Sequence, residues 1–144
     1  MLALFCGLIS DRVIQPVGFE RLRILVAQGE SAVRQATVEF FATEGWGVRG
    51  AEDGHEALEI ARGFQPGVLV TNWVLPGQVS GCALAESLRF AIPKIGLVFL
   101  TNLPIEKLQS PIAHFAPCVA VETPCTSAEL VEVVRRMARQ EPSP

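Results

Sequence analysis

Few residue combinations in this chain could support catalysis, and the strongest one pairs Cys82 with a histidine. A thiol beside His55 or His114 would supply the nucleophile and the base of acyl-transfer chemistry. These residues fall on predicted helices that are not neighbours in the fold expected below. Nothing in the sequence supplies an orienting acid or an oxyanion hole. We therefore expect no catalytic residue and interpret the chain as a protein that is not an enzyme.

Metal-binding and phosphate-binding motifs are also missing from the sequence. The cysteines at positions 6, 82, 118 and 125 form no CxxC pair and have no histidine at ligand spacing. We interpret them as small buried residues of a protein in a reducing cytosol. The segment QGES is too short and has one glycine, which excludes a glycine-rich phosphate loop. We expect no cofactor and no metal.

Composition indicates one globular domain. The chain has 144 residues, of which 49% are hydrophobic and 19% charged, and its net charge of −3 gives no basic field for nucleic acid. Its start, MLALFCGLIS, has no leading positive charge and is too short to span a bilayer. It is either an apolar segment that docks on the domain or the product of a start site placed too far upstream. We assign residues 1–20 to an N-terminal extension, 21–140 to the domain and 141–144 to a tail.

From residue 21 onward, short apolar runs alternate with amphipathic stretches of helical length, which predicts βαβ units around a parallel sheet. Strands are expected at residues 24–26, 46–51, 68–71, 95–100 and 118–122. The first helix is expected to begin at Ser31 as its N-cap and to stop at Gly45. Its predicted buried residues are Val33, Ala36, Phe40 and Phe41.

The remaining helices are predicted from capping and proline signals. The capping box Asp53–Glu56 predicts the start of the second helix, which ends near residue 63. The capping box Thr126–Glu129 predicts the start of the last helix. The last helix carries an apolar stripe of Leu130, Val133, Val134 and Met137. The third helix is expected at about 82–89. Prolines 104, 111 and 117 predict a short or broken fourth helix, restarted by Ser110 as cap with Pro111 in its first position.

Five strands and five helices in strict alternation predict a flavodoxin-like (βα)5 fold. This fold is a doubly wound, five-stranded parallel sheet in a three-layer α/β/α arrangement. Such sheets place their sites at the carboxyl ends of the strands. Function is therefore expected in the residues that follow the first, third, fourth and fifth strands.

Segments at these strand ends resemble the response-regulator receiver domain family. They are RILVAQGES, VLVTNWVLPG, VFLTN and VAVETPC. The match runs from about residue 21 to residue 139, with the order and spacing of the family. The resemblance implies three carboxylates that hold Mg²⁺, one of which accepts a phosphoryl group. It also implies a lysine that neutralises the developing charge and a Ser or Thr that bonds the phosphoryl group.

Most of that site is missing from this chain. The acidic pair falls on Gln28 and Gly29, the acceptor aspartate on Asn72, and the lysine on Thr123, while the aromatic switch residue falls on Ala120. Thr101 and Pro124 match the family, and a cis bond before Pro124 is implied by the resemblance. Because nucleophile, metal ligands and counter-charge are lost together, we expect a pseudo-receiver. Its degenerate phosphorylation-site positions are Gln28, Gly29, Asn72, Thr101, Thr123 and Pro124.

The resemblance further implies a two-component, phosphorelay-type signalling role through a protein-binding face built from the fourth helix, fifth strand and fifth helix. The expected interface residues are Trp73, Pro111, Phe115, Val121, Val134 and Arg135. Trp73 is either an interface anchor or a filler of the space left by the lost acidic groups. We expect a cytoplasmic protein that binds a histidine kinase, an output protein, a regulator or a second copy of itself. We expect no contact with nucleic acid or membrane.

Two alternatives stay open. The chain could be a phosphate-accepting response regulator with a non-standard site, which would bind Mg²⁺ and incorporate phosphate. It could instead be a flavodoxin-like enzyme or small-ligand-binding domain, which would hold a nucleotide, flavin or metabolite at the strand ends.

Overall fold

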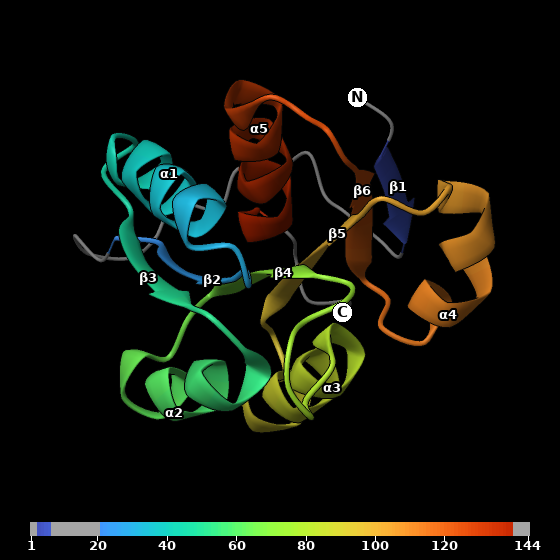
Figure 1. The fold of residues 1–144 in the computed structure, drawn as a ribbon, viewed down its shortest axis with the longest axis horizontal. Helices are drawn as coiled ribbons and strands as arrows, with labels where there is room; N and C mark the ends of the chain where they lie inside the picture. Colours follow the sequence, from blue (N-terminus) through green and yellow to red (C-terminus); the bar gives the residue numbers. More distant parts are fainter. Residues whose placement is uncertain (1–2, 7–20, 140–144) are drawn as a thin grey trace.

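The apolar runs of the sequence form the central sheet of the molecule. The computed structural model describes residues 3–6 and 21–139 (Figure 1). The sheet order is β1-β6-β5-β4-β2-β3, and the strands from β2 to β6 are mutually parallel. These five are β2 (Arg23–Ala27), β3 (Gly47–Ala51), β4 (Val68–Asn72), β5 (Gly96–Thr101) and β6 (Cys118–Glu122). The predicted flavodoxin-like α/β fold is confirmed.

Helices cover both faces of the sheet. In Figure 1, α1 and α5 lie on one face, while α2 and α3 lie on the other. The helices are α1 (Ser31–Ala42), α2 (Gly54–Phe64), α3 (Gly81–Ala91), α4 (Gln109–Ala113) and α5 (Ser127–Ala138), with a 3-10 turn, η1 (Ile105–Leu108), before α4. Residues on successive strand positions face opposite layers. Leu25 therefore packs in the cluster with α2, α3 and α4, while Ile24 and Val26 pack with α1 and α5.

An additional strand, β1 (Ala3–Cys6), lies on the outer edge of β6. It pairs antiparallel with β6, with Ala3 opposite Val121 and Cys6 opposite Cys118. Leu4 packs against the α2–α3–α4 side of the core and Ala3 against the α1–α5 side. Residues 3–6 thus dock on the domain, one of the two interpretations left open above. In the part of the chain that the structure describes, the sheet has six strands where five were predicted.

Side chains cap three of the five described α-helices, which are α2 by Asp53, α3 by Ser80 and α5 by Thr126, whereas α1 and α4 have no side-chain cap. The Thr126–Glu129 box is complete, and both of its hydrogen bonds measure 3.1 Å. At α2 the Asp53 carboxylate accepts from Glu56 N, but the Glu56 carboxylate accepts from Glu52 N rather than from Asp53 N, so the predicted box is incomplete. The prediction of Ser31 as a cap is wrong, because Ser31 is already the first helical residue and Glu30 is the N-cap, without a side-chain bond.

The buried face of α1 differs from the predicted one. Phe41 is fully buried, whereas Val33 is 43% exposed and Phe40 37% exposed, and Ala36 is exposed as well. Adjacent residues on a helix point about 100° apart, so burying Phe41 against the sheet turns Phe40 outward. Val33, Ala36 and Phe40 are spaced i, i+3 and i+7, so they share one outward flank.

The segment before β6 is broken, as its prolines predict. A 3-10 turn precedes the five-residue helix α4. The prediction of Ser110 as the cap with Pro111 in the first position is wrong in register, because α4 begins at Gln109 after Leu108. Within the described residues, no helix combines the length and the apolar character needed to cross a bilayer.

Candidate functional site

The carboxyl ends of β2, β4, β5 and β6 bring the predicted site positions together. Gln28, Asn72, Thr101, Thr123 and Pro124 all line one cleft of about 660 Å³. Other residues of the lining come from α1 and from the start of α5, so the cleft lies above the strand ends and between these two helices. This is the place where doubly wound sheets hold their ligands.

Two primary amides form the floor of the cleft. Gln28 Nε2 donates to Asn72 Oδ1 at 3.2 Å, and Asn72 Nδ2 donates to Gln28 Oε1 at 3.0 Å. Gln28 Oε1 also accepts from the backbone N–H of Glu30 at 3.1 Å. Gln28 is buried, with 9% of its surface exposed, and Asn72 is half-buried. Asn72, at the position where the resemblance implies the acceptor aspartate, is thus one member of a neutral, reciprocal amide pair.

Gly29, the second position of the expected acidic pair, lies under Pro76. A Cβ atom on Gly29 would lie 3.0 Å from Cδ of Pro76, closer than side chains normally pack. A residue other than glycine here requires the Pro76 ring to move by a few tenths of an ångström. The sequence alone shows the missing charge at position 29, but it does not show that Pro76 occupies the space.

The remaining hydroxyls are used within the protein. Thr101 is 4% exposed, and its Oγ1 accepts from the backbone N–H of Leu103 at 2.9 Å. Thr123, at the lysine position, donates from Oγ1 to the carbonyl of Thr101 at 3.2 Å. The Thr123–Pro124 peptide bond is cis, as the resemblance implies. The bond from Thr123 to Thr101 joins the ends of β5 and β6 without a charged group.

Trp73 follows Asn72 and lies half-buried at the edge of the cleft. Its backbone N–H donates to the carbonyl of Leu100 at 2.7 Å, and its ring packs edge-on against Phe99 at 5.2 Å. Gly81 explains how close this segment lies to α3, because a Cβ atom there would lie 2.2 Å from the Asn72 carbonyl oxygen. Gly81 was not recognised from the sequence, since its only local signal is a glycine after the N-cap Ser80.

Three residues expected at the interface do not reach the surface. Val121 and Val134 are fully buried and Phe115 is 7% exposed, because they pack in the core on the two sides of the sheet. The expectation that these side chains contact a partner is therefore corrected. Pro111 is exposed on α4. The edge of β6, which lies in the middle of the expected face, is paired with β1 along Cys118–Val121.

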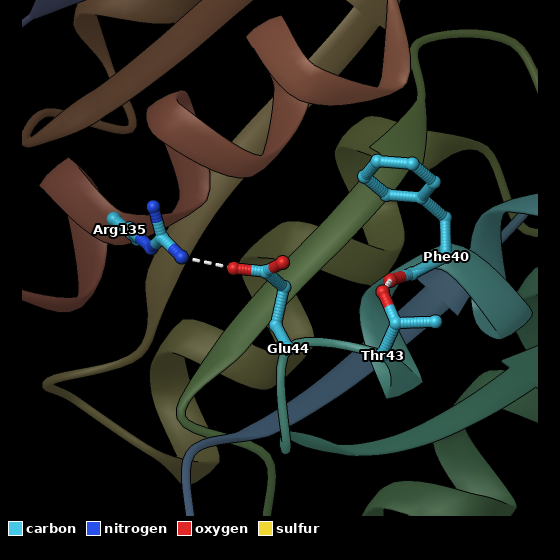
Figure 2. A network of polar contacts seen from close by, with 4 residues as sticks. All are labelled: Phe40, Thr43, Glu44 and Arg135. Atoms are coloured by element: carbon cyan, nitrogen blue, oxygen red, sulfur yellow. Dashed lines mark hydrogen bonds and ion pairs between the residues drawn. The ribbon is translucent and has the colours of Figure 1, made fainter.

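Arg135 lies on the side of α5 that faces α1. Its guanidinium forms an ion pair with Glu44, which follows α1 (Figure 2), and lies 6.0 Å from the ring centre of Trp46. In the same view, the Thr43 hydroxyl donates to the Phe40 carbonyl at 2.6 Å, which closes the end of α1. Arg135 thus lies on α5, one of the three elements of the expected face, but its side chain is engaged with Glu44 and Trp46.

The expectation that the helices carrying Cys82 and His55 are not neighbours is wrong, because α3 packs beside α2. The side chains of His55 and His114 nevertheless contact other residues than Cys82. Burial raises the pKa of the Cys82 thiol, which disfavours the reactive thiolate. His55 Nε2 lies 3.3 Å from the carboxylate of Glu59 on the surface of α2. His114 packs edge-on against Phe115.

The donor set at the strand ends does not fit Mg²⁺. This ion prefers anionic oxygen ligands, and the positions that carry them in the family hold an amide, a glycine and a second amide. No cluster of three or more His, Cys, Asp or Glu side chains able to hold a metal occurs among residues 3–6 and 21–139. Nor does a lysine replace the metal charge, since Thr123 stands at that position.

Comparisons with known proteins agree with this architecture. The family model described as response regulator receiver domain matches residues 24–135. The chemotaxis protein CheY4 of Vibrio cholerae is similar, with a TM-score of 0.73 and 21% identity over 82% of this chain and 99% of that chain. A response regulator receiver protein from Sinorhizobium medicae is also similar, with a TM-score of 0.75 and 21% identity over 84% of this chain and 97% of that chain.

A third similar structure is that of the response regulator TrrA from Thermotoga maritima, which was solved in complex with Mg(2+)-BeF. It gives a TM-score of 0.69 and 26% identity over 81% of this chain and 98% of that chain. No curated protein matches the sequence.

Proposed function

This chain belongs to the response regulator receiver domain family, and we propose that it acts in two-component signalling as a protein-binding module that phosphorylation does not switch. The observation that carries the proposal is the reciprocal amide pair of Gln28 and Asn72. An amide at position 72 cannot form an acyl phosphate. Its partner Gln28 contributes no negative charge to hold Mg²⁺.

The surroundings of the amide pair support the same proposal. Phosphoryl transfer needs positive charge at the transferred group, and Thr123 stands where the family has a lysine. The hydroxyl of Thr101 is bonded to its own loop through Leu103 N. A switch residue must exchange one partner for another, and no cationic side chain among the described lining residues would hold a phosphoryl group near Thr101.

The partner class follows from the family. We propose a cytoplasmic signalling protein, such as a histidine kinase, an output protein or a regulator, or a second copy of this chain. Two exposed apolar side chains line the strand-end cleft, Val33 (43% exposed) and Val74 (73%), and Leu103, which follows the lining residue Asn102, is 41% exposed. A partner would therefore contact the mouth of the cleft.

Titration with beryllofluoride and Mg²⁺, followed by amide NMR, tests the proposal. We expect no saturable shifts at Asn72 or Thr101, and no mass increase after incubation with acetyl phosphate. Saturable shifts at these amides, or a stable adduct of one phosphoryl group, would overturn the proposal and favour a response regulator with a non-standard site.

A restored variant makes a negative result informative. Q28D, N72D and T123K return the charges, and G29D combined with P76A provides space for the second acidic side chain. This five-fold variant is expected to bind beryllofluoride with Mg²⁺, while the native chain under identical conditions does not. A receiver domain with a complete site serves as the positive control for the reagent.

A further inference from the structure

The cleft above the amide pair has the dimensions of a small-molecule site. Its volume is about 660 Å³, within the range of roughly 300–1,000 Å³ that ligand pockets span. It lies at the ends of β2 and β4, where the strand order reverses, which is the topological switch point of a doubly wound fold. The cleft at this position is present although the residues at the expected Mg²⁺-ligand positions are uncharged.

The lining of the cleft combines an apolar wall with a polar floor. Its apolar lining comes from Ala32, Val33 and Ala36 of α1, from Leu130 of α5 and from Trp73. Gln28, Asn72 and Thr123 supply amide and hydroxyl groups below. Pockets that bind small molecules are built in this way, with apolar walls and a few fixed polar groups.

The reciprocal pair fixes which polar groups remain for a ligand. A primary amide nitrogen has two hydrogens, and the pair uses one from Gln28 and one from Asn72. Each nitrogen therefore keeps one N–H beyond the pair. Gln28 Oε1 already accepts from Asn72 Nδ2 and Glu30 N, so it is saturated. The pair thus leaves two N–H donors and one acceptor site, on Asn72 Oδ1, so a ligand that bonds to both donors must supply acceptor oxygen.

The nearly uncharged lining of the cleft favours an uncharged ligand. Of the described residues that line the cleft, Glu30 alone is charged, and it is exposed. A phosphate or carboxylate would meet no cationic side chain among these lining residues and would be repelled by the carboxylate of Glu30. A carbonyl oxygen on an apolar body meets no such repulsion and matches both the donors and the walls.

We propose that this cleft binds a small uncharged carbonyl compound, such as a cyclic amide or lactone with an apolar body, whose carbonyl oxygen accepts from the Gln28–Asn72 pair. This inference rests on the proposed function, because it requires a site without metal or phosphoryl group. Ligand binding would then bias the exposed rim of Val33, Val74 and Leu103 that a partner contacts.

The experiment uses coumarin and quinolin-2-one as uncharged probes, with coumarin-3-carboxylate and benzoate as anionic counterparts. Binding to the full chain is followed by NMR of backbone and side-chain amides. We expect saturable shifts at the Gln28 and Asn72 side-chain amides with the uncharged probes. The anions are expected to bind at least ten-fold more weakly.

Two substitutions on the same helix make the site assignment falsifiable. Ala36 is exposed and lines the cleft, so Ala36→Phe should fill it and weaken probe binding at least ten-fold. Ala42 is exposed on α1 and is not among the lining residues, so Ala42→Phe should leave binding unchanged. Folding of both variants is checked by circular dichroism.

Three outcomes would overturn the inference: no shift up to the solubility limit of either probe, equal or tighter binding of the anions, or equal binding by the Ala36→Phe variant. None of these affects the proposed function, which is tested with beryllofluoride. Conversely, saturable beryllofluoride binding would overturn the proposed function whatever the probes do.

Discussion

At the scale of single residues, Gln28 and Asn72 form two hydrogen bonds between uncharged amides where the family resemblance implies carboxylates. Two carboxylates at positions 28 and 72 would repel each other unless a cation lay between them. The amides of Gln28 and Asn72 instead satisfy each other, and Glu30 N supplies a third bond. A paired polar group in a half-buried place stabilises the fold, whereas the same group without its partner destabilises it.

The substitution Asn72→Asp tests this pairing. It removes the donor to Gln28 Oε1 and places a carboxylate oxygen against it, so the free energy of unfolding should fall by about 1–3 kcal/mol. Urea denaturation measures the change. Asn102→Asp, at the exposed position just after β5, is the matched control and should stay within about 0.5 kcal/mol of the native chain. Equal effects at the two positions would show that the amide pair contributes nothing to stability.

The cysteines provide a second test at this scale. Burial raises the pKa of Cys82, and burial with the nearby Glu129 raises that of Cys125. At a given pH, a raised pKa means a smaller thiolate fraction and slower alkylation. At pH 8 both thiols should react with iodoacetamide more slowly than in the urea-unfolded chain, and the rate should rise further with pH. Peptide mass mapping at timed intervals measures this, and equal rates in both states would contradict the assignment.

At the scale of elements, features determined by neighbouring residues were predictable from the sequence, whereas features determined by packing against distant residues were not. The Thr126–Glu129 box and the broken segment before β6 were predictable, because their causes lie within a few residues of each other. The buried face of α1 was not, because Phe40 and Phe41 are adjacent phenylalanines and only packing against the sheet decides between them. The losses of charge at the site were visible in the sequence, but the bond between Gln28 and Asn72 joins positions 44 residues apart.

The approach of α3 to the end of β4 also belongs to this scale, and Gly81 permits it. In Gly81→Ala the new methyl group would lie 2.2 Å from the Asn72 carbonyl oxygen and 2.8 Å from that of Trp73. Relieving this clash should lower the free energy of unfolding by about 1–3 kcal/mol.

Gly63 is the matched control, because it lies in α2 and a Cβ atom added there would have no neighbouring atom within 4 Å. Gly63→Ala should stabilise the protein by roughly 0.5–1 kcal/mol through helix propensity alone. Thermal and urea unfolding of both variants measure the difference in sign. A stabilising Gly81→Ala change would show that α3 lies farther from β4 than these distances require.

At the scale of the whole molecule, the position of β1 decides which surface can contact a partner. Its four residues pair with β6 from Cys118 to Val121. An unpaired edge strand offers N–H and C=O groups to another chain, and β1 takes up those of β6. With Phe115, Val121 and Val134 buried as well, these observations favour the exposed apolar side chains around the cleft as the proposed contact surface.

Hydrogen exchange can test whether β1 holds this edge in solution. Leu4 packs against the core side that contains α4, so Leu4→Asp should release β1 by placing a charge against apolar groups. The outward-facing amides of β6 should then exchange at least ten-fold faster. Amides of β4, which lies inside the sheet between β5 and β2, should keep their protection and serve as the internal control. Unchanged exchange in β6 would mean that β1 does not protect the edge. Faster exchange throughout the sheet would mean that β1 instead supports the stability of the whole domain, and that the edge cannot open by itself.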